Sequence, residues 1–97
     1  DILKIARENI QKIIAERERM SAFLKGQDGI TNVYPSDANF LLIQMENAHA
    51  LYEYALSKGI IMRDMSSAQG TQNCIRLTIG TPEQNDLVMD LVREFYK

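Results

Sequence analysis

Two arginines carry the clearest chemical signal in this sequence, because each interrupts a short apolar segment. Arg76 lies within CIRLTIG (residues 74–80), and Arg63 lies near the end of IIMRD (residues 60–64). Both segments are rich in β-branched residues and are typical of strands. A guanidinium group is planar and can form two parallel hydrogen bonds with a carboxylate or a phosphate. The two arginines therefore indicate a possible anion-binding site.

Strand alternation places Arg76 on one face of its strand, with Cys74 and Thr78. The opposite face is apolar and can pack on helices; it carries Ile75, Leu77 and Ile79. An exposed or ion-paired arginine is the simpler interpretation of Arg76, and a site awaiting an anionic ligand is the alternative.

Arg63 has the same two interpretations, because Asp64 follows it directly. A surface ion pair between the two would contribute little to stability. The functional interpretation is a second anion clamp, which could converge with Arg76 on one ligand if the two strand ends are neighbours.

Other polar residues offer weaker signals. His49 has no cluster of metal-ligand residues around it and is expected to face solvent. Cys74 is expected to be a buried structural thiol. Gly80, Thr81 and Pro82 open a helix whose N-terminus could bind an anion, but an ordinary capping interaction is the simpler expectation. No catalytic residue, metal ligand or cofactor-binding residue is predicted within this chain.

The elements that must position these residues follow from periodicity and capping signals. Helices are expected over residues 2–24, from Asn47 to a stop at Gly59, and after a cap at Thr81 with Pro82 and Gln84. Strands are expected over residues 30–34 (an edge strand), 39–45 (buried on both faces), 60–64 and 74–80, with a loop over 65–73. This order predicts a two-layer α+β domain, in which a small mixed or antiparallel sheet packs against helices. Residues 1–97 form one such domain, with a long N-terminal helix (1–25) and an α+β core (30–97).

The composition of the chain limits the classes of protein to which it can belong. The chain has 97 residues, of which 45% are hydrophobic and 25% charged, as in ordinary globular domains. Its net charge of −2 argues against a nucleic-acid binder. A single cysteine favours a reducing compartment, and we expect a cytoplasmic location. No apolar run approaches the roughly 20 residues of a membrane span. The first residue is not Met, which suggests a piece of a longer protein.

Three segments, taken together in order and spacing, resemble the C-terminal part of the histidinol-phosphate aminotransferase family. They are YPSDANFLL (34–42), GIIMRDMSS (59–67) and IRLTIGTPEQND (75–86). The likeness covers most of the chain from Tyr34 onward, and the N-terminal helix fits by position. Met62 departs mildly from the family pattern, which often has Val before the arginine.

The resemblance implies a fold-type I transaminase that uses pyridoxal phosphate to exchange an amino group between histidinol phosphate and 2-oxoglutarate, in histidine biosynthesis. Such enzymes are homodimers, and their small domain closes over the substrate. The resemblance assigns Arg76 to the carboxylate end of the substrate and Arg63 to its distal anion, phosphate or carboxylate. Which arginine contacts the phosphate stays open. One site must accept a phosphate ester and a dicarboxylate in turn, which two guanidinium groups can do.

Transamination also needs a lysine that bonds covalently to the cofactor. None of the five lysines of this chain lies in the serine-flanked setting of the family's cofactor lysine; they are Lys4, Lys12, Lys25, Lys58 and Lys97. We therefore expect the chain alone to bind no pyridoxal phosphate and to be inactive.

Alternatives remain at this point. A related enzyme, such as threonine-phosphate decarboxylase or an aromatic aminotransferase, would share the Arg76 role. A freestanding α+β module that senses anions through Arg76, or a plain interaction domain, would belong to another class. A much longer parent gene would favour the enzyme.

Overall fold

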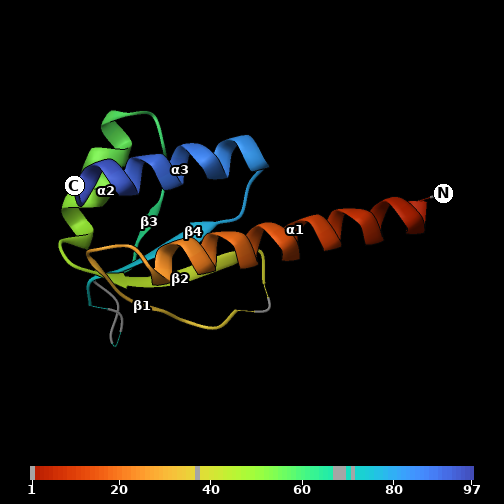
Figure 1. Ribbon diagram of the computed structural model, residues 1–97, viewed down its shortest axis with the longest axis horizontal. Coiled ribbons are helices and arrows are strands. Elements are labelled where there is room, and N and C mark those ends of the chain that lie inside the picture. Colours follow the sequence, from red (N-terminus) through yellow and green to blue (C-terminus); the bar gives the residue numbers. More distant parts are fainter. Residues whose placement is uncertain (1, 37, 67–69, 71) are drawn as a thin grey trace.

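The computed structural model describes residues 2–36, 38–66, 70 and 72–97. Its helices and strands, in chain order, are α1 (Ile2–Lys25), β1 (Ile30–Val33), β2 (Phe40–Met45), α2 (Ala48–Ser57), β3 (Arg63–Asp64), β4 (Cys74–Thr78) and α3 (Pro82–Phe95). Figure 1 shows α2, α3 and the C-terminal part of α1 beside the sheet, while the N-terminal part of α1 extends beyond it. The predicted α+β class is confirmed. Two residues of the quoted motifs, Asp37 and Ser67, lie outside the described residues, and so do positions 67–69 and 71 of the predicted loop over 65–73.

The four strands form one sheet in the order β1-β2-β4-β3, and every described pairing is antiparallel. The edge position predicted for the strand at residues 30–34 is confirmed. Antiparallel pairing places directly opposite residues on the same face, so the register of the ladder fixes which side chains lie together.

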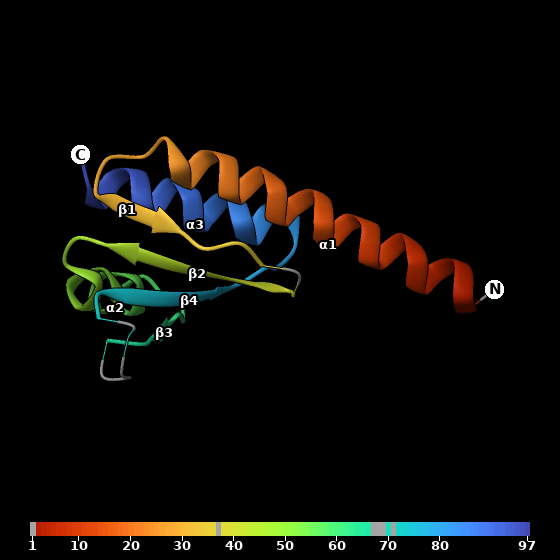
Figure 2. The same ribbon diagram turned by 90° about the horizontal axis from the view of Figure 1, so that it is seen from below.

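The helices cover one face of this sheet. α1 contacts β1 and β2, α2 contacts β3 and β4, and α3 lies between α1 and α2. Figure 2 shows α1 and α3 together on one side of β2 and β4. The buried side chains of the strands point into this layer; they include Val33, Leu41, Ile43, Met45, Ile75 and Leu77. We call the other side the open face.

The prediction that β2 is buried on both faces is wrong. Its residues alternate between buried and half-buried, because helices pack on one side only. The apolar sequence of β2 is typical of a strand with helices on both faces, but here one of its faces is only partly covered.

Helix α1 is longer than the sheet it packs on. Its C-terminal part carries the buried Met20 and Leu24, as predicted from a helix ending near Gly26. Its N-terminal part projects beyond the rest of the molecule (Figures 1 and 2). Apolar side chains are exposed there; they are Ile2, Leu3, Ile5, Ile10 and Ile14. The core beneath α1 is too short to cover this apolar surface.

Helix ends followed the capping signals in one case and departed from them in another. At α3 the Thr81 side chain accepts from the Gln84 backbone, and the Gln84 side chain accepts from the Thr81 backbone, which is the predicted capping box. At α2, Asn47 precedes the helix in a left-handed conformation (φ 56°) and its side chain makes no capping bond. The prediction that Asn47 caps this helix with its side chain is therefore wrong, because the tight turn that follows β2 sets the Asn47 backbone.

Candidate functional site

Arg63 and Arg76 lie directly opposite each other in the sheet. Arg63 of β3 pairs with Arg76 of β4, and the adjacent pair is Asp64 with Ile75. Directly opposite residues have Cβ atoms about 4.5–5.5 Å apart and project to the same side. The convergence of the two arginines, which spacing alone left open, is therefore a property of the strand register.

The two arginines project from the open face. Ile75 and Leu77, which flank Arg76, are buried on the helix side, and Arg76 itself is half-buried. This confirms the face predicted from alternation. The neighbouring open-face residues, identified by register, are Asn32, Phe40, Leu42, Gln44, Cys74 and Thr78. Cys74 is buried, as predicted, despite its place on this face.

The Arg76 side chain is held over an aromatic ring. Its guanidinium carbon lies 4.2 Å from the centroid of the Phe40 ring. Phe40 pairs with Thr78 and is thus a diagonal neighbour of Arg76 across the β2–β4 ladder. A guanidinium over a ring face gains a cation–π attraction and keeps its N–H groups free to donate. Arg76 is therefore partly preorganised for a planar anion.

Neither arginine forms an ion pair with a carboxylate in the described part of the chain. The surface pair between Arg63 and Asp64 is a wrong interpretation, because the Asp64 carboxylate contacts His49 instead. Like charges directly opposite in a sheet are destabilising. Two uncompensated guanidinium groups side by side therefore form an arrangement that an anion would stabilise.

Strand β4 is firmly fixed at the end that follows Arg76. The Asn85 side chain is buried in α3, and its Oδ1 accepts from the Gly80 N–H at 2.9 Å. Its Nδ2 donates to the Gly80 carbonyl at 3.0 Å and to Glu16 Oε1 at 3.0 Å. Asn85 thus joins the end of β4 to both long helices. Sequence reasoning missed it, although its spacing to Val88 and Val92 places it on the buried stripe of α3.

His49 belongs to a charged cluster at the other edge of the site. It is exposed, as expected, but its Nδ1 lies 2.7 Å from Asp64 Oδ2 and its Nε2 lies 3.3 Å from Glu53 Oε1. The hydrogen bond to Asp64 is the main cause that raises the pKa of His49. Contacts with Ser66 and then with His49 lower the pKa of Asp64. The two carboxylates flank opposite ring nitrogens and do not converge. No group of residues in the described ranges could hold a metal ion.

The lysines of the chain lie outside the four strands. All five are exposed, and the Lys58 ammonium lies over the Tyr54 ring, on α2. None of them occupies a register position on the open face. The side chains beside the arginines are aromatic, aliphatic, amide, thiol and hydroxyl groups. They can bind and orient an anion but supply no amine for covalent chemistry.

None of the helices among the described residues is both long enough and apolar enough to cross a membrane.

The sequence matches one family model, that of the class I and II aminotransferases, over residues 3–92. Among curated proteins, it is 37% identical over 92 residues to a histidinol-phosphate aminotransferase of Xylella fastidiosa. That alignment covers 95% of this chain and 25% of the relative. The chain therefore spans about a quarter of the length of the curated relative it matches.

Solved structures agree with this likeness. The histidinol-phosphate aminotransferase of Clostridium acetobutylicum superposes with a TM-score of 0.85 at 25% identity, over 93% of this chain and 28% of that one. The L-threonine-O-3-phosphate decarboxylase of Porphyromonas gingivalis superposes with a TM-score of 0.79 at 27% identity, over 88% and 27%. The same fold thus occurs within proteins named for two different reactions.

Proposed function

Since this chain belongs to the class I and II aminotransferase family, we propose that it is the substrate-binding small domain of a histidinol-phosphate aminotransferase. The parent enzyme would transfer an amino group between L-histidinol phosphate and 2-oxoglutarate in histidine biosynthesis, as a cytoplasmic homodimer. The curated relative of that name, matched over 95% of this chain, supports the choice of reaction.

The observation that carries the proposal is the arginine pair on the open face. Arg76 stacks on Phe40 and is half-buried, so it is the more fixed of the two cations. Arg63 is exposed on a two-residue strand and is less constrained. In the proposal, Arg76 grips the carboxylate end of the substrate and Arg63 binds the distal anion, phosphate or carboxylate. Both ligands offer oxygens in geometries that suit a guanidinium fork.

Pyridoxal phosphate would supply the electron-withdrawing chemistry of the transfer when bound to the parent. The described side chains beside Arg63 and Arg76 do not fit the covalent attachment of that group, because no lysine holds a register position on the open face. In our proposal, the cofactor site lies in the part of the parent that this chain does not contain. This chain binds the substrate's anionic groups, orients them, and is inactive by itself.

The test is to replace each arginine by alanine in the full-length parent. Arg76→Ala should weaken the binding of both amino donor and acceptor, while Arg63→Ala should mainly affect the distal anion. A charge-assisted hydrogen bond contributes about 1.5–3 kcal/mol, so kcat/KM should fall about 10- to 150-fold. Lys58→Ala removes an exposed cation at the end of α2 and is the matched control. Unchanged kinetics for both arginine variants would contradict the assignment.

A second candidate follows from the decarboxylase likeness at 27% identity. A threonine-phosphate decarboxylase would release carbon dioxide from a phosphorylated amino acid and would need no 2-oxoglutarate. Assaying the parent with each phosphorylated substrate, with and without 2-oxoglutarate, separates the two. A freestanding anion-sensing module would gain support if the gene encoded no further domain.

A further inference from the structure

Strand β3 is a weak element that carries an important residue. It has only two residues and pairs with β4 at two positions, Arg63 with Arg76 and Asp64 with Ile75. The predicted strand over residues 60–64 is shorter because the Ile60 N–H bonds to the Ala55 carbonyl at the end of α2, at 2.8 Å. Two ladder positions alone leave the direction of the Arg63 side chain poorly determined.

The Asp64 side chain supplies the missing restraint. Asp64 lies opposite the buried Ile75, so it points to the helix side while Arg63 points to the open face. Its Oδ2 meets His49 Nδ1 of α2 at 2.7 Å, and its Oδ1 accepts from the Ser66 backbone N–H at 2.9 Å. One carboxylate thus joins β3 to α2 and closes the turn that follows the strand.

We propose that His49 and Asp64 form a latch that fixes β3 against α2 and thereby positions Arg63 toward the substrate's distal anion. The proposal rests on the function proposed above. His49 touches no substrate in this scheme; it is a positioning residue that acts through Asp64 and the backbone of β3.

The latch depends on the charge of His49. Both ring nitrogens face carboxylate oxygens, Asp64 at 2.7 Å and Glu53 at 3.3 Å, and only the imidazolium donates from both. The Tyr52 ring stacks beside it with centroids 6.0 Å apart. Arg63 lines the same shallow hollow as His49 and Asp64, although alternation along β3 directs its side chain to the open face.

The direction of the pH effect follows from these contacts. The pKa of His49 is raised, first by Asp64 and also by Glu53. A raised pKa means that the latch is complete below the ordinary histidine pKa of about 6.5. It weakens as pH rises through the raised pKa. Because the neutral ring can still donate once to Asp64, positioning decreases at high pH but is not abolished.

The experiment uses the full-length holoenzyme and the ratio of kcat/KM for histidinol phosphate to that for histidinol, which lacks the phosphate. His49→Ala should lower this ratio about two- to five-fold at about pH 6.5, as expected for a loss of one exposed charged contact. The difference from wild type should shrink at about pH 9. Comparing variants at the same pH cancels the titration of the phosphate itself. Glu53→Gln keeps the Asp64 contact and is the matched control.

A second readout does not depend on activity. His49 is the single histidine of this chain, so NMR titration of its imidazole in the 97-residue protein reports its pKa directly. Asp64→Asn should lower that pKa toward the ordinary value. If the pKa does not move, the His49–Asp64 contact is absent in solution and the latch is refuted.

The outcomes separate the latch from the proposed function. If Arg63→Ala lowers the ratio and His49→Ala does not, the latch is wrong and the role of Arg63 stands. If His49→Ala reduces kcat/KM equally for both substrates at every pH, His49 is merely structural and the latch is wrong. If Arg63→Ala leaves the ratio unchanged, the proposed role of Arg63 fails, and the latch fails with it.

Discussion

Replacing Asn85 by alanine should destabilise this domain strongly, although Asn85 lies on α3 and is not one of the open-face residues around Arg63 and Arg76. The residue is 1% exposed, and its amide makes three hydrogen bonds of 2.9–3.0 Å. Two of them satisfy both backbone groups of Gly80, and the third joins α3 to Glu16 of α1. Alanine would leave these partners without the amide and would also open a small void.

The expected magnitude follows from the number of partners left unsatisfied. Each buried group that loses its partner costs about 1–3 kcal/mol, and Glu16 can recover hydration because it is near the surface. We therefore expect a loss of about 2–4 kcal/mol in the free energy of unfolding, dominated by the two Gly80 groups. For a domain of this size, that corresponds to a decrease in Tm of about 8–30 °C.

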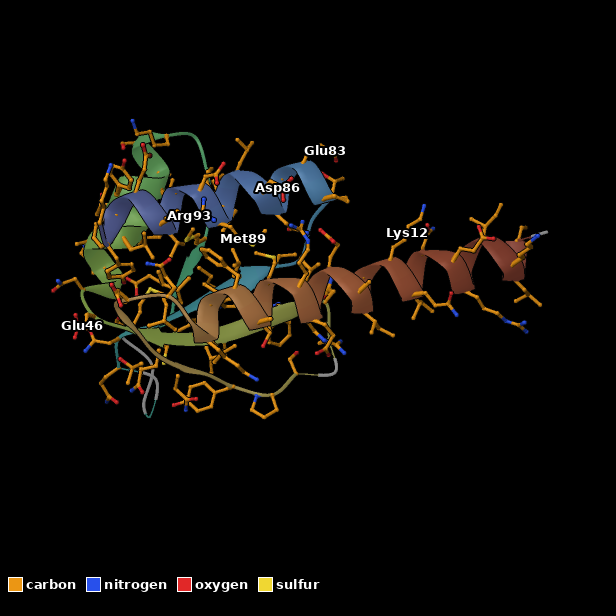
Figure 3. All side chains as sticks on the ribbon, in the orientation of Figure 1. Lys12, Glu46, Glu83, Asp86, Met89 and Arg93 are labelled. Carbon is orange, nitrogen blue, oxygen red and sulfur yellow. The ribbon has the colours of Figure 1, made fainter. Side chains whose placement is uncertain are left out.

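The assay is urea and thermal unfolding of the 97-residue chain, followed by circular dichroism. Glu83→Ala is the control, because Glu83 is exposed at the start of the same helix (Figure 3). It should change stability by less than about 0.5 kcal/mol. An Asn85→Ala protein within about 0.5 kcal/mol of wild type would show that water replaces the amide at Gly80. It would refute the argument that Asn85 fixes the end of β4.

Two further predictions concern the isolated chain. After the chain is mixed with pyridoxal phosphate and reduced with borohydride, mass spectrometry should show no single lysine modified stoichiometrically, because all five lysines are exposed and lie outside the strands that carry the arginines. Specific labelling of one lysine would contradict this. The chain should also self-associate through the projecting apolar part of α1. Light scattering should show a mass that increases with concentration and that decreases after Ile5→Lys and Ile10→Lys. A strictly monomeric wild-type chain at high concentration would oppose this prediction.

Local signals in the sequence were sufficient for much of the fold. The Thr81–Gln84 capping box depends on neighbours three residues apart, and the structure has it as predicted. The face on which Arg76 lies depends only on strand alternation, which is equally local. The long N-terminal helix was predicted from helical periodicity, which is local as well, and the structure has it over Ile2–Lys25.

Features that depend on distant partners could not be read from the sequence. The half-covered face of β2 depends on how many layers pack on the sheet, and its apolar run gives no sign of that number. Asp64 was assigned to its neighbour Arg63, but its partner is His49, fifteen residues away on another element. Asn85 gave one usable signal, a polar residue on an apolar helical stripe, which indicates a buried hydrogen-bond network.

The two arginines of the site differ in how firmly the fold holds them, and this difference bears on what they can bind. Arg76 lies on a strand that is paired on both sides and fixed beyond its end through Gly80, and its guanidinium stacks on Phe40. Arg63 depends on two ladder positions and one carboxylate contact. A fixed cation beside an adjustable one can grip a constant group while adapting to a second anion of different size. Loosening Arg63 further should therefore impair selection between anions before it impairs binding as such.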